Sequence, residues 1–272
     1  MKAIINKTLA LLLFASAAVA QPTDYSTYVD PFIGTGGHGH TFPGVTVPFG
    51  MMQLSPDTRL SGWDGCSGYH NSDNRIYGFS HTHLSGTGAS DYCDILLMPT
   101  TGKPQFSNKK YSSLFSKKNE KAEAGYYSVV LDKNNIKVEL ASTTRTGLHK
   151  YTFPKSSSSN VILDLTHRDR VKESDITING STEITGKRVS DNWANNQILY
   201  FVIQFSKPFV RSQKMGSLKA SVSFETEEGE VIYAKIGMSA VSVEGARKNL
   251  EAEQKGFDLQ KLKNDANAVK RT

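Results

Sequence analysis

Apolar and polar residues alternate along most of the chain from Gly125 onward. The segments YYSVVLD (126–132) and NIKVELAS (135–142) flank turn-forming residues, and this pattern predicts a β-hairpin because successive side chains of a strand point to opposite faces. Further alternating segments follow at similar intervals: HKYTF, NVILDL, DITING, TEITGKRV, ILYFVIQFS, KASVSFE and VIYAKIGMSAVSV. Strands this rich in β-branched and aromatic residues predict an all-β fold, an antiparallel β-sandwich. The four serines at 156–159 are interpreted as a loop between two of these strands.

The segment from Tyr25 to Pro99 has a different composition, rich in Gly, Pro, Asp, Ser and aromatic residues. Its apolar runs are short: VDPFIG, GVTVPFGMMQLSP and DILLMP. None has the period of a helix, so the segment is predicted to form short strands joined by long, ordered loops. Loops of this length in a compact domain usually carry function.

The last thirty residues are predicted to form two helices. GARKNLEAEQ (245–254) ends before Gly256, and Asp258 is placed to cap LQKLKNDANAV (259–269). The second helix has one apolar stripe, made by Leu259, Leu262, Ala266 and Val269. Such a stripe needs a surface to pack against, and the sequence ends at Thr272. We therefore expect the chain to be the front part of a longer protein.

The first twenty residues have the pattern of a secretory signal peptide. Lys2 and Lys7 precede an apolar run, and the small residues of Ala18–Ala20 end it. The sequence therefore predicts a signal peptide at 1–20, a β-sandwich domain at 21–240 and a helical linker at 241–272, in a periplasmic or secreted protein. No other segment is apolar enough to predict a membrane span.

Charge is distributed unevenly along the chain. Without the two lysines of the signal peptide, the net charge of +6 falls to +4. Residues 21–100 hold seven Asp and two Arg, a net of −5, so the remainder carries +9. The lysines are scattered through alternating segments without interleaved aromatic residues, which indicates a solvated surface and predicts no nucleic-acid partner.

The two cysteines, Cys66 and Cys93, are predicted to form a disulfide, because an exported protein meets an oxidising environment. The bridge would close a loop and stabilise the fold by about 3.5 kcal/mol. That loop includes GFSHTHLSGTG (78–88). In a strand, His81, His83 and Ser85 would share one face. Such a group is compatible with a metal, a proton-transfer partner, a sugar, or a hydrogen-bonded framework.

Other motifs narrow the chemistry. GTGGHG (34–39) has the spacing of a dinucleotide loop, but Pro31 precedes it and HTFP follows it, where a helix should begin. No G-x-S-x-G is present for a serine hydrolase. SGWDGCSGYH (61–70) places Trp63 beside Asp64 on a glycine-rich loop, which favours a sugar platform; the alternative is a tryptophan that fills the edge of the sandwich.

Several of these segments together resemble a known family. YVDPFIGTGG, TFPGVTVPFGMMQLSPDT, GWDGCSGYH, IYGFSHTHLSGTG and DYCDILLMP resemble the N-terminal domain of glycoside hydrolase family 92, as do FSKPF (205–209) and IGMSAVSVEGARKNLEAE (236–253). The family comprises calcium-dependent, inverting exo-α-mannosidases that act on mannose-containing glycans. The resemblance implies a β-supersandwich related to galactose-mutarotase-like domains, then linker helices, then an (α/α)6 barrel.

By the resemblance, the barrel would begin where this sequence ends and would supply the general acid, the general base and most ligands of Ca2+. The isolated chain is then expected to have no catalytic residue, no metal of its own and no activity. The residues expected to contact substrate are Phe32, Ile33, Gly34, Trp63, Asp64, His81 and His83. A freestanding carbohydrate-binding module is the alternative function. Cys93 stands where many relatives have glycine, which fits the predicted disulfide.

Overall fold

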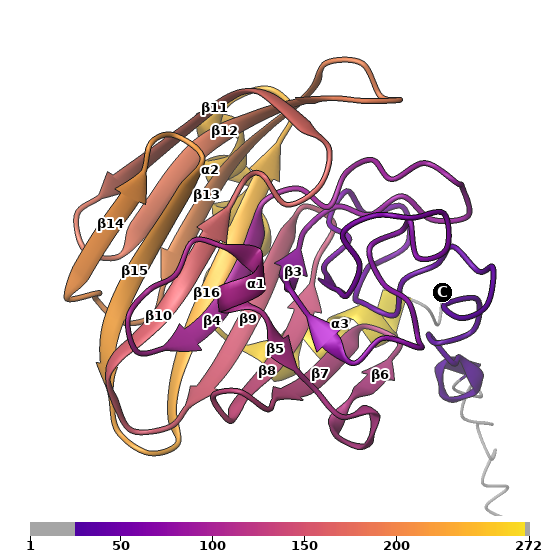
Figure 1. The fold of residues 1–272 in the computed structure, drawn as a ribbon, viewed down its shortest axis with the longest axis horizontal. Helices are drawn as coiled ribbons and strands as arrows, with labels where there is room; N and C mark the ends of the chain where they lie inside the picture. The colour runs from indigo at the N-terminus through magenta and orange to yellow at the C-terminus, as the bar shows by residue number, and fades with distance from the viewer. Residues whose placement is uncertain (1–24, 270–272) are drawn as a thin grey trace, which may run out of the picture.

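The strands of the chain form an all-β sandwich, seen in a computed structural model that describes residues 25–269 (Figure 1). The predicted signal peptide, residues 1–20, lies outside the described residues. The first strands are short: β1 (Ser55–Asp57), β2 (Arg75–Ile76), β3 (Gly78–Ser80), β4 (Leu96–Thr101), β5 (Ser113–Leu114) and β6 (Lys121–Glu123). Longer strands follow: β7 (Tyr126–Leu131), β8 (Ile136–Ser142), β9 (Thr146–Phe153), β10 (Ser156–Asp164), β11 (Arg170–Asn179), β12 (Glu183–Asp191), β13 (Gln197–Phe205), β14 (Arg211–Met215), β15 (Lys219–Thr226) and β16 (Glu230–Ser239).

Two antiparallel sheets make the sandwich. One has the order β1-β3-β4-β10-β15-β14, and the other has the order β11-β12-β13-β16-β9-β8-β7-β6. The predicted hairpin is β7–β8, with Val129 opposite Val138. One large core lies between the sheets; fully buried side chains such as Phe79, Tyr151 and Phe201 belong to it. The predicted all-β sandwich is confirmed.

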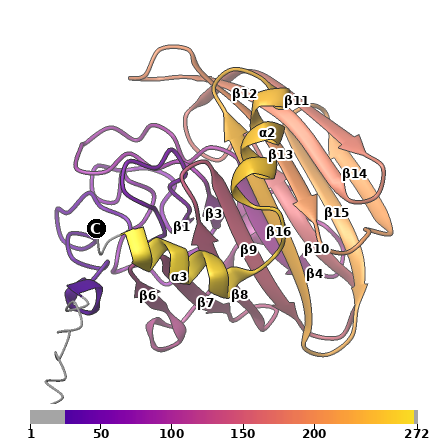
Figure 2. The ribbon, with the colours of Figure 1, turned by 180° about the vertical axis from the view of Figure 1, so that it is seen from behind.

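The C-terminal helices cover the outer face of the larger sheet (Figure 2). Helix α2 (Val243–Glu253) begins at the cap Ser242, and its Leu250 packs on Val202 of β13. Gly237 of β16 lets the helix approach, since a Cβ there would lie 2.5 Å from a helix carbonyl oxygen. Helix α3 (Leu259–Val269) is capped as predicted, because the Lys261 backbone N–H donates to the Asp258 carboxylate over 2.9 Å. Within residues 25–269 no helix combines the length and apolar character that a membrane crossing needs.

The chain's own sheet covers Leu262 in the apolar stripe of α3. Leu262 and Ala266 are buried, and Leu262 packs against Ala141 and Leu148, which lie on the outer face of β8 and β9. The surface that this stripe was expected to need is therefore supplied by the chain itself at Leu262 and Ala266. The outer face of the sheet already offers the apolar surface that a 3.6-residue stripe needs.

The prediction of a serine loop at 156–159 was also wrong. These residues form the first half of β10, which pairs with β4 on one side and β15 on the other. Ser159 is buried, and its hydroxyl shares a hydrogen bond of 2.8 Å with Thr226. Pairing on both sides outweighs the poor strand propensity of serine. The sequence also gave no sign of β14, an edge strand whose five side chains are all exposed.

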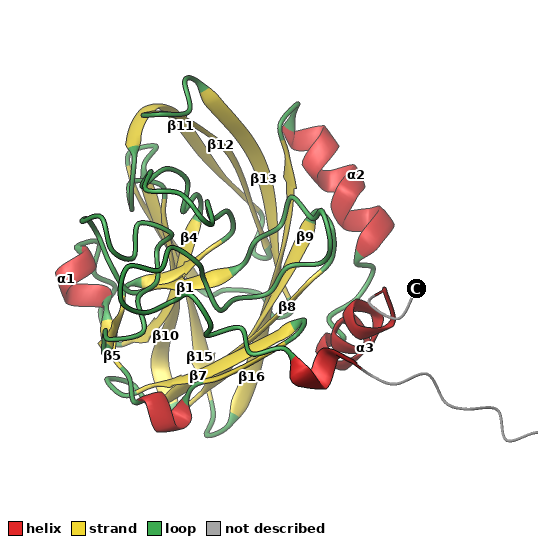
Figure 3. Cartoon of the chain, turned by 90° about the vertical axis from the view of Figure 1, so that its right-hand side faces the viewer, coloured by secondary structure: helices red, strands yellow, loops and turns green. Residues whose placement is uncertain are grey.

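Three long loops carry most of the N-terminal segment. We name them loop A (residues 29–44), loop B (residues 58–74) and loop C (residues 81–95). Figure 1 shows them in indigo and purple beside the sheets, and Figure 3, viewed from that side, shows them in green in front of the sandwich. Long ordered loops between short strands are what the composition of this segment predicts.

Candidate functional site

Loops A and B are fixed to one another by backbone contacts. The Asn71 backbone N–H donates to the Thr35 carbonyl over 2.8 Å, and His70 Nε2 bonds the Gly37 carbonyl over 2.9 Å. Arg168, from the turn after β10, holds loop B from below by donating to the Cys66 carbonyl over 2.7 Å. The two loops therefore form a single ordered surface.

Trp63 lies where the three loops meet. The Gly86 backbone N–H of loop C donates to the His40 carbonyl of loop A over 2.7 Å. The His40 ring meets the Trp63 indole edge to face, at 5.0 Å between centroids. Gly88 lies directly against the indole, because a Cβ there would be only 2.1 Å from it. Trp63 remains 65% exposed, so a supported aromatic face is presented to solvent.

Asp64 stands next to this indole with its carboxylate oriented. One oxygen bonds His38 Nδ1 of loop A over 2.9 Å. That hydrogen bond lowers the pKa of the Asp64 carboxyl below its usual value, so the group is ionised at neutral pH. An oriented carboxylate beside an exposed indole can accept hydroxyl hydrogen bonds while the ring stacks on an apolar sugar face.

Phe32, Ile33 and Gly34 occupy the neighbouring part of loop A. Phe32 is half-buried against the Tyr69 ring, with 6.4 Å between centroids, and supports the loop. Ile33 is 74% exposed, and Gly34 has a φ of +80°, a conformation that favours glycine. The structure therefore brings loop A to the same surface as Trp63 and Asp64.

His81 lies inside the sandwich, away from that surface. Its Nδ1 bonds the Ile95 carbonyl over 2.6 Å, and its Nε2 bonds His149 Nε2 over 2.8 Å. The other ring nitrogen of His149 bonds the Tyr151 hydroxyl over 2.9 Å. All these ring nitrogens have a partner when both rings are neutral. His81 then donates to the Ile95 carbonyl and accepts from His149, and His149 accepts from the Tyr151 hydroxyl. His81 is fully buried in this structure, and its predicted contact with substrate stays a prediction.

His83 is likewise enclosed. Its Nδ1 bonds the Gln53 carbonyl over 2.7 Å, and its Nε2 lies 3.0 Å from Asp57 Oδ1. Burial alone would raise the pKa of Asp57, but the neighbouring His83 and His167 imidazoles outweigh it and lower that pKa to about 2. The sequence left a metal, a proton-transfer partner, a sugar or a hydrogen-bonded framework as alternatives for the two histidines. In the structure His81 is part of a hydrogen-bonded framework, and His83 lies in a buried polar cluster with Asp57.

The predicted disulfide is absent from the structure. Cys66 and Cys93 are both buried free thiols. The Cys66 thiol donates to the Thr87 carbonyl over 2.8 Å, whereas the Cys93 sulfur lies beside Asp57 and His83. Each sulfur thus has its own polar neighbours, and hydrogen bonds rather than a covalent bridge join loops B and C. The sequence showed only that the two cysteines flank one loop region.

One candidate was missed in the sequence. Trp193, in the turn between β12 and β13, is 71% exposed. The Asp91 carboxylate of loop C holds this turn, accepting from Asn192 Nδ2 over 2.8 Å and from the Ala194 backbone N–H over 2.7 Å. A tryptophan in a polar turn, SDNWANN, was the available signal. Loop C therefore contacts two loops that each expose an indole.

Acid is expected to destabilise the domain through His149. Burial, with His81 as a second cause, holds the pKa of His149 well below its usual 6.5. The unfolded chain therefore binds a proton below pH 6.5 that the folded chain does not bind, so stability is lost as pH falls through 6.5 toward the folded pKa. From pH 7 to pH 5 this one histidine should cost about 2 kcal/mol.

Urea unfolding at pH 7 and pH 5 measures this effect. The His149→Gln variant should lose that share of the pH dependence, whereas His38→Gln, which removes an imidazole whose side chain is 91% exposed, should keep it. An unchanged pH dependence in His149→Gln would contradict the assignment.

Among the His, Cys, Asp and Glu side chains of residues 25–269, one group has donor atoms close enough to hold a metal: Asp57, His83 and Cys93, whose donors are oxygen, nitrogen and sulfur. Calcium prefers six to eight oxygen ligands, so this donor set does not suit it.

The chain is thus an antiparallel β-sandwich whose loops present the Trp63 indole beside the oriented carboxylate of Asp64. Residues 28–239 match the Glycosyl hydrolase family 92 N-terminal domain, and the chain belongs to this family. An uncharacterized secreted glycosidase of Arthroderma benhamiae is 24% identical over 302 residues, which cover 95% of this chain and 39% of the relative.

Solved structures agree with this assignment. A family GH92 α-mannosidase from Bacteroides thetaiotaomicron, in complex with mannoimidazole, is 31% identical, with a TM-score of 0.84 over 92% of this chain and 37% of that protein. A family GH92 inverting mannosidase from the same organism is 26% identical, with a TM-score of 0.77 over 91% of this chain and 36% of that one. The chain thus spans less than half the length of these relatives.

Proposed function

We propose that this chain is the substrate-contacting N-terminal part of a secreted, calcium-dependent, inverting exo-α-mannosidase acting on mannose-containing glycans. The observation that carries the proposal is the exposed Trp63 indole, supported by Gly88 and His40 beside the oriented carboxylate of Asp64. It supports the proposal because a GH92 relative was solved with mannoimidazole, and another is described as an inverting mannosidase.

The positions of the carboxylates in the loops support the proposal that the catalytic acid and base lie outside this domain. Inverting hydrolysis needs an acid and a base about 6.5–9.5 Å apart. Asp57, Asp91 and Asp94 are buried, and Asp73 is paired with Arg59 over 3.1 Å. Asp30 of loop A is exposed and accepts from the Phe32 backbone N–H over 2.9 Å, and Asp64 is the carboxylate beside Trp63. In this proposal both catalytic carboxylates and the ligands of Ca2+ come from a C-terminal (α/α)6 barrel joined through the linker at 241–272.

The isolated chain should therefore have no α-mannosidase activity. The test is to measure release of the aryl group from an aryl α-mannoside by the 272-residue chain and by the chain extended through its catalytic domain. Only the extended protein should hydrolyse the aryl α-mannoside, and NMR should show inversion at the anomeric carbon. A calcium chelator should abolish this activity. Turnover by the isolated chain that is lost in Asp64→Asn would overturn the proposal.

A freestanding carbohydrate-binding module is the second candidate, because the exposed indole of Trp63 would serve binding alone. The two functions predict different results with methyl α-mannoside and the isolated chain. A module should bind the sugar without any further domain, and titration calorimetry would detect it. A domain that forms one wall of a composite site should show little binding until the second wall is present.

Export is also part of the proposal. Residues 1–20 have the pattern of a signal peptide, and the Arthroderma benhamiae relative is described as secreted. Sequencing the N-terminus of protein recovered outside the cytoplasm should give Gln21 as the first residue. Recovery of the intact N-terminus Met1 would contradict export by this route.

A further inference from the structure

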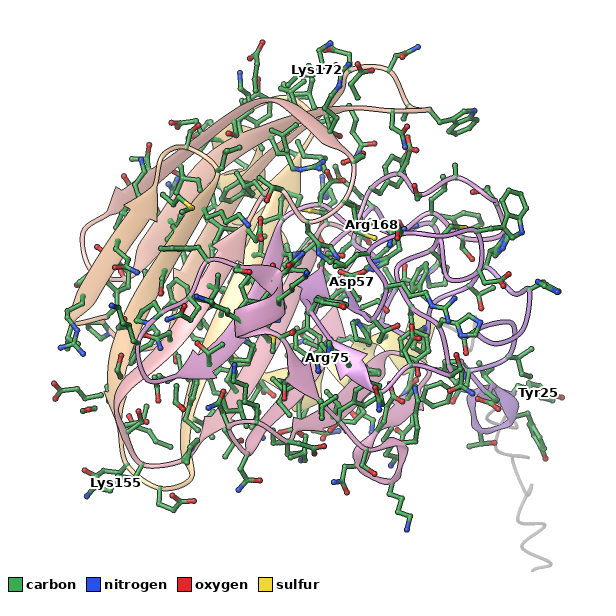
Figure 4. All side chains as sticks on the ribbon, viewed as in Figure 1. Tyr25, Asp57, Arg75, Lys155, Arg168 and Lys172 are labelled. Carbon is green, nitrogen blue, oxygen red and sulfur yellow. The ribbon has the colours of Figure 1, made fainter. Side chains whose placement is uncertain are left out.

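A buried group of metal-binding side chains lies beneath the loops, apart from the proposed sugar surface. Asp57 at the end of β1, and His83 and Cys93 of loop C, place one donor atom each within 4.8 Å of the others, and all three are buried. Figure 4 labels Asp57 in the middle of the molecule, with Arg168 close above it. A charged carboxylate enclosed in this way needs strong compensation.

His167, from the turn after β10, completes the group. Its Nε2 lies 3.4 Å from Asp57 Oδ2, and both side chains are fully enclosed. Neither ring nitrogen of His167 makes a hydrogen bond, and Asp57 Oδ2 makes none either. Three buried polar atoms without hydrogen bonds at one place are unusual, because most buried polar groups are satisfied. We call this group the buried cluster: Asp57, His83, Cys93 and His167.

The orientation of His83 is that of a metal ligand. Its Nδ1 donates to the Gln53 carbonyl over 2.7 Å, so in the neutral ring the lone pair of Nε2 faces the Asp57 carboxylate at 3.0 Å. Two acceptors then lie side by side; the Ser80 hydroxyl is 3.2 Å from Nε2, and a cation between the two acceptors would compensate both. A second-sphere hydrogen bond from the other ring nitrogen to a backbone carbonyl is typical of histidines that bind zinc.

Gly68 of loop B closes the cluster from one side. It has a φ of +100°, and a Cβ at this position would lie 2.2 Å from Asp57 Oδ1 and 2.9 Å from Cys93 Sγ. Backbone thus packs directly on the donor atoms. The surroundings are those of a closed structural site and leave no path for a substrate.

We propose that the buried cluster binds one structural zinc ion. A thiolate, two imidazoles and a carboxylate form a four-coordinate donor set suited to zinc and poorly suited to calcium. Bonds of about 2.0–2.3 Å bring tetrahedral donors to about 3.3–3.8 Å from one another. The donors of Asp57, His83 and Cys93, which lie within 4.8 Å of one another, need to contract by no more than about 1 Å, and the His167 ring would move from its place beside Asp57 to join them. On binding, Cys93 releases its proton to solvent, and the Zn2+, thiolate and carboxylate charges sum to zero.

The ion would join three parts of the chain. Asp57 belongs to a strand, His83 and Cys93 to loop C, and His167 to the turn that also carries Arg168. Loop C supports the Trp63 indole through Gly88. Zinc would therefore take the place of the absent disulfide as the crosslink beneath the site, in contrast to the expectation that this chain holds no metal.

Metal content and spectroscopy test the proposal on the 272-residue chain. After unfolding, refolding with a slight excess of Zn2+ and dialysis, the wild type should contain about one zinc per chain. Cobalt substitution should give the thiolate charge-transfer band and the strong visible absorption of a tetrahedral site. Removing the ion with a chelator should lower the Tm. Zinc that binds only the folded state adds its binding free energy to the stability of that state, and the chelator takes this contribution away.

Two cysteine variants give matched comparisons. Cys93→Ser should lose the cobalt–thiolate band and weaken zinc binding by at least about 100-fold. Cys66→Ser removes the other buried thiol, which donates to the Thr87 carbonyl. This variant should keep the cobalt–thiolate band and the zinc affinity of the wild type. If Cys93→Ser does not fold, His167→Asn replaces it and should weaken zinc binding while keeping the thiolate band.

The competing account is an ion pair between Asp57 and a protonated His83, without metal. It predicts less than about 0.1 zinc per refolded wild-type chain and a Tm that neither zinc nor chelator changes. That result would overturn the proposal. A zinc content that is equal in wild type, Cys93→Ser and His167→Asn would also overturn it, because the metal would then be bound elsewhere.

Discussion

Replacing Arg188 by alanine should destabilise the domain by about 3–5 kcal/mol. Arg188 lies on β12 with its side chain 1% exposed, and its guanidinium pairs with the buried carboxylates of Asp94 and Asp169. It also donates to the Leu165 carbonyl over 2.8 Å. Truncation leaves two carboxylates enclosed without their cation, and this uncompensated burial is the source of the loss.

The neighbouring position on the same strand provides the control. Lys187 pairs with Glu173 over 2.7 Å, but its side chain is 30% exposed and that of Glu173 is 66% exposed. Such an exposed pair contributes at most about 1 kcal/mol, so Lys187→Ala should change stability little. Urea unfolding followed by circular dichroism gives both values. Equal losses in the two variants would show that burial of the Arg188 pair is not what matters.

Replacing Trp63 by alanine should lower kcat/KM ten- to a hundred-fold in the protein extended through its catalytic domain. This prediction depends on the proposed function. Loss of an indole wall should cost about 1–3 kcal/mol of transition-state binding. The Tm should change little, because Trp63 is 65% exposed and packs mainly on Gly88 and His40.

Met215→Ala is the control for Trp63, since Met215 is 53% exposed and lies on the edge strand β14. It should alter neither kinetics nor Tm. A large fall in Tm with normal kinetics in Trp63→Ala would instead make the indole structural, as the sequence alone allowed. Normal values of both would remove Trp63 from the site.

Local patterns predicted the strands and helices well for physical reasons. Period-two alternation specifies which side chains of β7 to β9 can face a core, and Asp258 can cap a helix because its carboxylate reaches the backbone N–H of Lys261. The serines of β10 were predicted wrongly because strands on both sides supply their hydrogen bonds, and neither strand is adjacent in sequence. The stripe on α3 was read correctly as apolar, and the chain's own sheet covers its Leu262.

Some features of the candidate site could be predicted from local sequence, and others depend on contacts between distant residues. The sequence by itself placed Trp63 beside Asp64 on a glycine-rich loop, because this segment lacks the alternation of a strand. Whether the indole fills the sandwich edge or is exposed was decided by the structure, which leaves it 65% exposed. Only the tertiary structure decided that His81 pairs with His149 and that His83 and Cys93 meet Asp57 and His167. These contacts join residues up to 110 positions apart. Sheet pairing brings them together, and no local spacing encodes it.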